Sequence, residues 1–160
     1  MYLSALEFLE EERDAWRPFE ALSELSDVAL EQPVAAAHGW SGRDLMGHLA
    51  GGLEGAVAVA RELAVNETSA TKDRLDAEWE TGGDAFNERR EREWAALPLA
   101  EVRKRFHDAS GELRGTLTVV PEARWLKHPT NMEFLASETI DHYVEHEADL
   151  AAILAAAGAV

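Results

Sequence analysis

The chain has 160 residues, 46% of them hydrophobic, and its 31 acidic and 15 basic side chains give a formal net charge of −16. This length favours one domain over residues 1–160, with enough apolar residues for a sizeable core. The acidic excess repels phosphate backbones and anionic lipid surfaces, so neither a nucleic acid nor a membrane is expected as a partner.

Cysteine is absent, which excludes disulfides, thiolate metal ligands and a cysteine nucleophile. No run of 18 apolar residues is present, and the N-terminal residues lack the basic start and apolar stretch of a secretory signal. We therefore expect a cytoplasmic protein with a solvated, acidic surface.

The sequence predicts an all-α fold, because Ala, Leu, Glu and Arg dominate and β-branched residues are sparse. The first predicted helix covers residues 4–25 and begins with Ser4 and Glu7 at the spacing of a capping box. Pro18 lies inside it and should kink or interrupt it. Residues 26–40 are expected to form a connector.

The second predicted helix covers residues 41–64, with Ser41 as its cap and Asp44 at the third helical position. Residues 65–83 are polar and form a connector that is long for a compact bundle. This connector either crosses the whole bundle or folds as a short extra helix around Leu75 and Trp79; the sequence does not choose between the two.

The third predicted helix covers residues 84–119, as two stretches that Pro98 separates or as one helix kinked there. The fourth covers residues 130–157 and ends before Gly158, a natural stop for a helix. The chain thus reads as a four-helix bundle without a sheet.

Three histidines carry the strongest chemical signal. His142 and His146 are spaced i, i+4, so both imidazoles project from one face of the fourth predicted helix, on the stripe expected to face the core. His48 lies between Leu45 and Leu49 in the second helix. Three imidazoles could hold a divalent metal and leave positions open for water or substrate. The competing interpretation is uncoordinated histidines, since this spacing alone is a weak signal.

Four glycines surround His48, namely Gly47, Gly51, Gly52 and Gly55. Glycine weakens a helix by roughly 1 kcal/mol relative to alanine, so the cluster requires a reason. Close helix packing is one reason, and space above a metal for a ligand is the other. In the second case Gly51, Gly52 and Gly55 should border the opening to that space.

Several neighbouring residues are candidates for supporting roles. Asp44, Glu145 or Asp149 could orient a ligand imidazole through its second nitrogen. We expect Asp44 to serve the helix N-terminus and Glu145 to be an exposed carboxylate. His107 is expected at the surface of the third helix. Packing in the core or at its rim is expected for the tryptophans Trp40, Trp79 and Trp125.

The stretch from Gly39 to Ala50, Gly-Trp-Ser-Gly-Arg-Asp-Leu-Met-Gly-His-Leu-Ala, resembles the Trp-Ser-x-x-Asp-Leu-x-x-His-Leu signature of the DinB-like superfamily. More closely, it is similar to the metal-binding N-terminal domain of mycothiol-dependent maleylpyruvate isomerases. The segment with His142 and His146 matches the second ligand segment of the superfamily. The isomerase has a carboxylate as its first ligand on this helix, whereas His142 is more similar to the wider DinB-like pattern.

This resemblance implies a DinB-like four-helix bundle with a long crossover between helices 2 and 3. It also implies one divalent metal ion, zinc or nickel, held by His48, His142 and His146, often in a homodimer. Members of the superfamily include thiol-dependent isomerases and S-transferases, together with a resistance branch with hydrolase activity.

The leading functional hypothesis is a metal-dependent enzyme, an S-transferase or isomerase, that uses a low-molecular-weight thiol such as mycothiol. Three neutral imidazoles leave the metal its full charge, which lowers the pKa of a bound thiol or water. Because the chain has no cysteine, a cosubstrate must supply the thiol that attacks a small electrophile. The alternatives are a metal-dependent hydrolase and a non-catalytic protein that binds a metal or small molecule.

Overall fold

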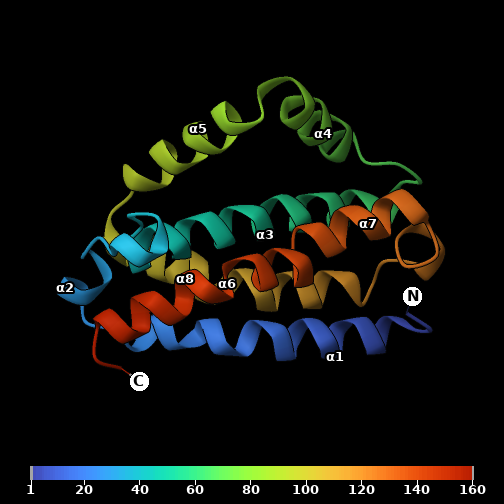
Figure 1. Cartoon of the computed structure of the whole chain (residues 1–160). Helices are drawn as coiled ribbons and strands as arrows, with labels where there is room; N and C mark the ends of the chain where they lie inside the picture. Colours follow the sequence, from blue (N-terminus) through green and yellow to red (C-terminus); the bar gives the residue numbers. More distant parts are fainter. Residues whose placement is uncertain (1, 160) are drawn as a thin grey trace.

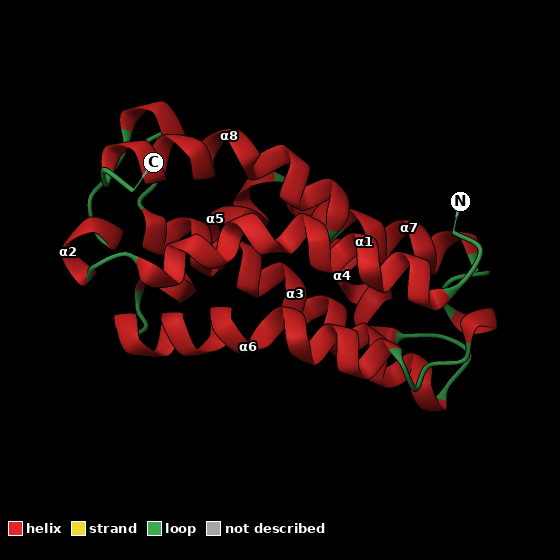
Figure 2. Cartoon of the chain, turned by 90° about the horizontal axis from the view of Figure 1, so that it is seen from below, coloured by secondary structure: helices red, strands yellow, loops and turns green. Residues whose placement is uncertain are grey.

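The computed structural model describes residues 2–159, and all regular secondary structure within that range is helical. The prediction of an all-α chain is thereby confirmed for the described part (Figure 2). Four long elements run beside one another around a common core, and Figure 1 shows them as the lower layers of the molecule. They are α1 (Ala5–Trp16), α3 (Gly42–Val65), α6 (Leu99–Leu117) and α8 (Ile140–Ala156).

The first predicted helix is two elements rather than one. α1 ends at Trp16, and the 3-10 helix η1 (Arg17–Glu24) continues the chain with Pro18 in its first turn. The interruption expected at Pro18 is observed, because proline cannot donate the backbone hydrogen bond that would continue α1. The connector then contains α2 (Asp27–Leu30) and the 3-10 helix η2 (Ala35–Ala37).

α3 begins as the sequence predicts. The side chain of Ser41 accepts a hydrogen bond from the backbone N–H of Asp44, and the Asp44 carboxylate accepts one from the backbone N–H of Ser41 at 2.9 Å. This reciprocal capping box fixes the start of the helix that carries His48. Much of α3 is buried, because it packs against α4, α5, α6 and α8.

The second connector and the first part of the third predicted helix form a layer outside the four long elements. Residues 65–83 contain α4 (Ala70–Gly82). Of the two alternatives for this connector, the extra helix is therefore the one observed. α5 (Asp84–Ala95) follows after a turn at Gly83, where φ is +47°, and α4 and α5 arch over α3 in Figure 1. A glycine accepts this left-handed backbone without steric cost.

The interpretation of residues 84–119 as one kinked helix is therefore wrong. α5 belongs to the outer layer, whereas α6 lies within the core layers, with Pro98 at its N-cap position between them. Proline disfavours helical conformation in the residue before it and cannot continue the hydrogen-bond ladder, so the chain changes direction there.

The last predicted helix is also divided. After the 3-10 helix η3 (Glu122–Arg124), the chain forms α7 (Pro129–Ser137) and then α8. Thr139 separates the two, with a φ of −129° and a ψ of −102°, and its hydroxyl donates to the Leu135 carbonyl at 2.6 Å. A threonine that bonds back to the preceding turn competes with the helical ladder, which is consistent with a break at this point.

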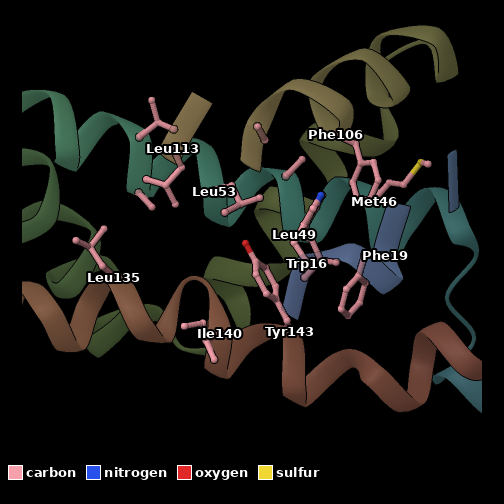
Figure 3. Packing of buried hydrophobic residues seen from close by; sticks show 14 of the residues in the cluster. Trp16, Phe19, Met46, Leu49, Leu53, Phe106, Leu113, Leu135, Ile140 and Tyr143 are labelled. Carbon is pink, nitrogen blue, oxygen red and sulfur yellow. The ribbon is translucent and has the colours of Figure 1, made fainter. Parts of the chain in front are cut away.

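Aromatic side chains fill the centre of the core, where Trp16, Phe19 and Tyr143 lie together against α3 (Figure 3). One buried carboxylate is included. Glu12 accepts hydrogen bonds from the Tyr143 hydroxyl at 2.9 Å and from Arg114 at 2.7 Å. None of the helices among residues 2–159 has the length and apolar character that a bilayer crossing requires.

Candidate metal centre

Three imidazoles meet between α3 and α8. His48 comes from α3, whereas His142 and His146 come from α8. His48 and His142 are 94 residues apart in the sequence. The Nε2 atoms of His48 and His142 are 2.7 Å apart, and one nitrogen from each of the three rings lies within 4.8 Å of the others. The sequence interpretation required these rings to converge, and they do.

The two helices explain this convergence. His142 and His146 share a face of α8 because they are one turn apart, and their ring centroids are 5.0 Å from each other. Leu45 and Leu49 are fully buried on either side of His48, so the stripe that seats α3 in the core also aims this imidazole at α8.

Asp149 fixes the orientation of one ring. Its carboxylate lies 2.8 Å from Nδ1 of His146 and is almost fully buried. When that Nδ1 carries the hydrogen and donates it to Asp149, Nε2 keeps its lone pair free toward the other two rings. Of the three carboxylates considered from sequence, Asp149 alone bonds one of these rings, since Asp44 caps α3 and Glu145 is exposed.

The surroundings keep two of the rings, those of His48 and His142, uncharged. Burial, followed by the neighbouring rings and Arg90, lowers the pKa of His48 to about 3. Burial, followed by His146 and Arg90, lowers the pKa of His142 to about 4. Both imidazoles are therefore neutral at pH 7, which is the form that binds a metal ion.

These residues fit a divalent ion. The buried Nδ1 of His142 has no hydrogen-bond partner, and two Nε2 atoms face each other across 2.7 Å. A tetrahedral zinc ion with bonds of about 2.0–2.1 Å sets its ligand atoms about 3.3 Å apart. The His48–His142 contact is shorter than this and the largest separation is at most 4.8 Å, so small ring rotations would form such a site.

A cavity of about 520 Å³ opens above the rings, and all three histidines line it. Its aromatic wall includes Trp40, whose ring stacks on His146 with centroids 5.4 Å apart and planes inclined by 23°. Trp79 lies half-exposed at the margin, whereas Trp125 is fully buried in the core. The expected packing is thus observed for Trp125 in the core and Trp40 at its rim, but not for Trp79, which is exposed.

No signal in the sequence pointed to Glu138 or Arg90, two of the charged residues that line the cavity. Glu138 lies one turn before His142 in the sequence, and burial raises the pKa of its carboxyl to about 7, with Arg90 opposing that shift and Asp76 adding to it. Arg90 projects from α5, a helix whose alternation of acidic and basic residues resembles any solvated surface. Arg90 lies inside the cavity only because α5 is positioned over α3.

The glycines around His48 serve close packing. A Cβ at Gly47 would lie 3.0 Å from Trp94 Cβ, and one at Gly55 would lie 3.3 Å from Leu75. At Gly51 it would lie 2.8 Å from Trp94 Nε1, and at Gly52 it would lie 2.8 Å from Glu138 Oε2. None of these glycines lines the cavity, so the expectation that Gly51, Gly52 and Gly55 border its opening is wrong.

The remaining histidines lie outside the cluster. His107 is 80% exposed on α6 and pairs with Asp108, as expected for a surface residue. His38 stands at the end of η2 with a left-handed φ of 56°, and its Nε2 is 3.7 Å from Asp149 Oδ1. His38 therefore lies on the far side of the carboxylate that orients His146.

Comparison with known proteins identifies one family. No curated protein and no solved structure matches the chain. The sequence profile described as the mycothiol maleylpyruvate isomerase N-terminal domain matches residues 9–151, which include all three clustered histidines. Since that match spans most of the 160 residues, the chain belongs to the mycothiol maleylpyruvate isomerase N-terminal domain family.

Proposed function

We propose that this protein is a metal-dependent enzyme that joins a low-molecular-weight thiol to a small electrophile, as an S-transferase or an isomerase does. The observation that carries the proposal is the convergence of His48, His142 and His146 at the wall of a 520 Å³ cavity. The family name adds mycothiol as the thiol to test first.

The chain's own residues supply the ligand set. His48 and His142 are held neutral by burial, and Asp149 directs His146 Nε2 toward them. Zinc or nickel is the proposed ion, because both accept imidazole nitrogen. A divalent ion held by three neutral nitrogens would keep its full charge and lower the pKa of a thiol beside it.

The cavity provides the space and the apolar surroundings that a thiol and an electrophile require. Trp40, Phe86 and Phe134 form aromatic parts of its lining, which reduce water around a bound ligand. The chain contains no cysteine, so the sulfur nucleophile must enter with the cosubstrate. Hydrolysis and simple binding would use the same cavity, and they differ from thiol transfer in whether turnover needs an added thiol.

The ligand assignment is tested by metal analysis of the purified protein. Wild-type protein should hold one zinc or nickel ion per chain, and His146→Ala should hold none while its circular dichroism spectrum stays helical. His107→Ala is the matched control, since His107 is exposed on α6. Full metal content in His146→Ala would refute the assignment.

The reaction is tested by a screen of thiols against electrophiles. Turnover should require both the metal and an added thiol such as mycothiol, bacillithiol or glutathione, and it should fall in His48→Ala. Activity that needs the metal but is undiminished without any thiol would instead establish a hydrolase. Tight small-molecule binding without turnover would establish a binding protein.

We also propose a fold type, a domain organisation and an oligomeric state for this chain. α1, α3, α6 and the α7–α8 segment would correspond to the helices of a DinB-like four-helix bundle, with α4 and α5 inside the long crossover. We propose a single domain over residues 1–160 that forms a homodimer in the cytoplasm. Size-exclusion chromatography with light scattering would test the homodimer.

A further inference from the structure

Arg90 is an unusual basic residue in this acidic chain. Acidic residues outnumber basic ones by 31 to 15. All three lysines form ion pairs, and among residues 2–159 the only arginines without one are Arg13 and Arg90. Arg13 is exposed on α1, whereas Arg90 is partly buried and lines the cavity above the histidines.

The guanidinium is held in place by packing. Its Nη2 lies 3.0 Å from where a Cβ at Gly51 would be, and its Cζ lies 5.3 Å from the centre of the Phe86 ring. The first contact presses Arg90 against α3, and the second places its charge against an aromatic ring. A side chain at Gly51 would crowd the guanidinium in this position.

The position of Arg90 relative to His48 follows from helix geometry. At about 100° per residue, Gly51 points about 60° to one side of His48 on α3, and Gly52 points about 40° to the other. Arg90 lies over Gly51, and the carboxylate of Glu138 lies over Gly52. The guanidinium of Arg90 and the carboxyl group of Glu138 thus lie on either side of the direction in which His48 points, one turn further along α3, and they do not form an ion pair.

A partly buried guanidinium without an ion-pair partner is costly. The planar fork of its N–H groups matches the two oxygens of a carboxylate. We propose that Arg90 binds the carboxylate of the substrate, and that the site is therefore specific for small electrophiles that carry one carboxylate. Asp76, Glu91 and Glu145 also line the cavity, and their carboxylates would repel a second negative charge. This inference rests on the proposed function, since it names the class of electrophile.

The test measures the binding of three probes by calorimetry. 3-Phenylpropionate carries one carboxylate, its methyl ester carries none, and phenylsuccinate carries two. We expect wild-type protein to bind the carboxylate at least about tenfold more tightly than the ester, because hydrogen bonds to charged groups are the stronger ones. Phenylsuccinate should bind more weakly than 3-phenylpropionate.

Variants assign that preference to Arg90. Arg90→Gln should reduce the ratio of carboxylate to ester affinity to about one, and Arg90→Lys should retain part of it, because an ammonium keeps the charge but loses the fork. Arg92→Gln removes the same charge from the same helix at a side chain that is 71% exposed, and it should leave the ratio unchanged.

The measurement is made on both metal-free and zinc-loaded protein. If the protein takes up no zinc, or does not add a thiol to any electrophile, the proposed function fails. The ratio of carboxylate to ester affinity in metal-free protein still reports on Arg90 in that case. A ratio near one in wild-type protein, or a ratio that persists in Arg90→Gln, would overturn the inference. Tighter binding of phenylsuccinate would overturn the restriction to one carboxylate. Thermal melts of each variant confirm that the compared proteins are folded.

Discussion

Asp149 lies one turn after His146 on α8, and its carboxylate stands 2.8 Å from Nδ1 of that ring. Both residues are shielded from solvent, so the carboxylate acts on the imidazole without strong screening by water. The contact fixes which nitrogen of His146 faces His48 and His142. Asp149 thereby supports the proposed metal centre without being one of its ligands.

We predict that Asp149→Asn weakens zinc binding by about 10–100-fold, the usual effect of removing a carboxylate that orients a metal-bound histidine. A competition titration with a chromophoric chelator measures the change. Glu147→Gln, which removes a charge from an exposed position of the same helix, serves as the control. Equal loss of affinity in the two variants would show that net charge, and not ring orientation, is responsible.

The metal-free protein should lose stability as pH falls below about 6.5. The pKa of His48 is lowered to about 3 and that of His142 to about 4, so the unfolded chain binds protons that the folded chain does not. Their contribution is present above the unfolded pKa of about 6.5 and is lost as pH falls through about 4 for His142 and about 3 for His48. Urea unfolding at several pH values in the presence of a chelator measures this.

Glu138 should act in the opposite direction in the same experiment. Its pKa is raised to about 7, so its contribution to stability is lost as pH rises from about 4.5 to 7. Glu138→Gln removes the group that opposes the histidines, so the fall of stability toward acid should be steeper than in wild-type protein. An unchanged slope in this variant would contradict the assignment to Glu138.

The packing role of the glycines gives a paired prediction. Gly111→Ala lies in α6 with no atom within 4 Å of the added methyl group, and it should stabilise the protein by about 1 kcal/mol. Gly47→Ala would place its Cβ 3.0 Å from Trp94 Cβ, so buried Trp94 must shift and the protein should be less stable. A gain of stability in both variants, measured by urea unfolding, would remove the packing explanation.

The buried carboxylate in the core gives a further prediction. Tyr143→Phe removes the hydroxyl that donates to Glu12 at 2.9 Å and leaves that oxygen short of a partner. We expect a loss of about 1–3 kcal/mol in the free energy of unfolding, the usual cost of an unsatisfied buried polar group. Zinc content should not change, although Tyr143 adjoins His142. A loss of zinc would mean that the hydroxyl also supports the site.

The sequence determined the local features of this protein. The spacing of His142 and His146 placed both rings on one helix face, and the Ser41–Asp44 box fixed the start of α3. Both follow from interactions within one turn of helix, where the neighbours are known from sequence spacing. The absence of cysteine similarly limits the chemistry, because composition alone decides which nucleophiles and metal ligands the chain can supply.

The tertiary structure decided the features that depend on contacts between distant residues. The turn at Pro98 and the position of α5 over α3 bring Arg90 into the cavity, although its helix has the charge pattern of a solvated surface. The side chains that pack on the glycines of α3 and the meeting of His48 with His142 also depend on how helices pack. Periodicity shows which side of a helix is apolar, but which residues meet it is decided by the packing of the whole chain.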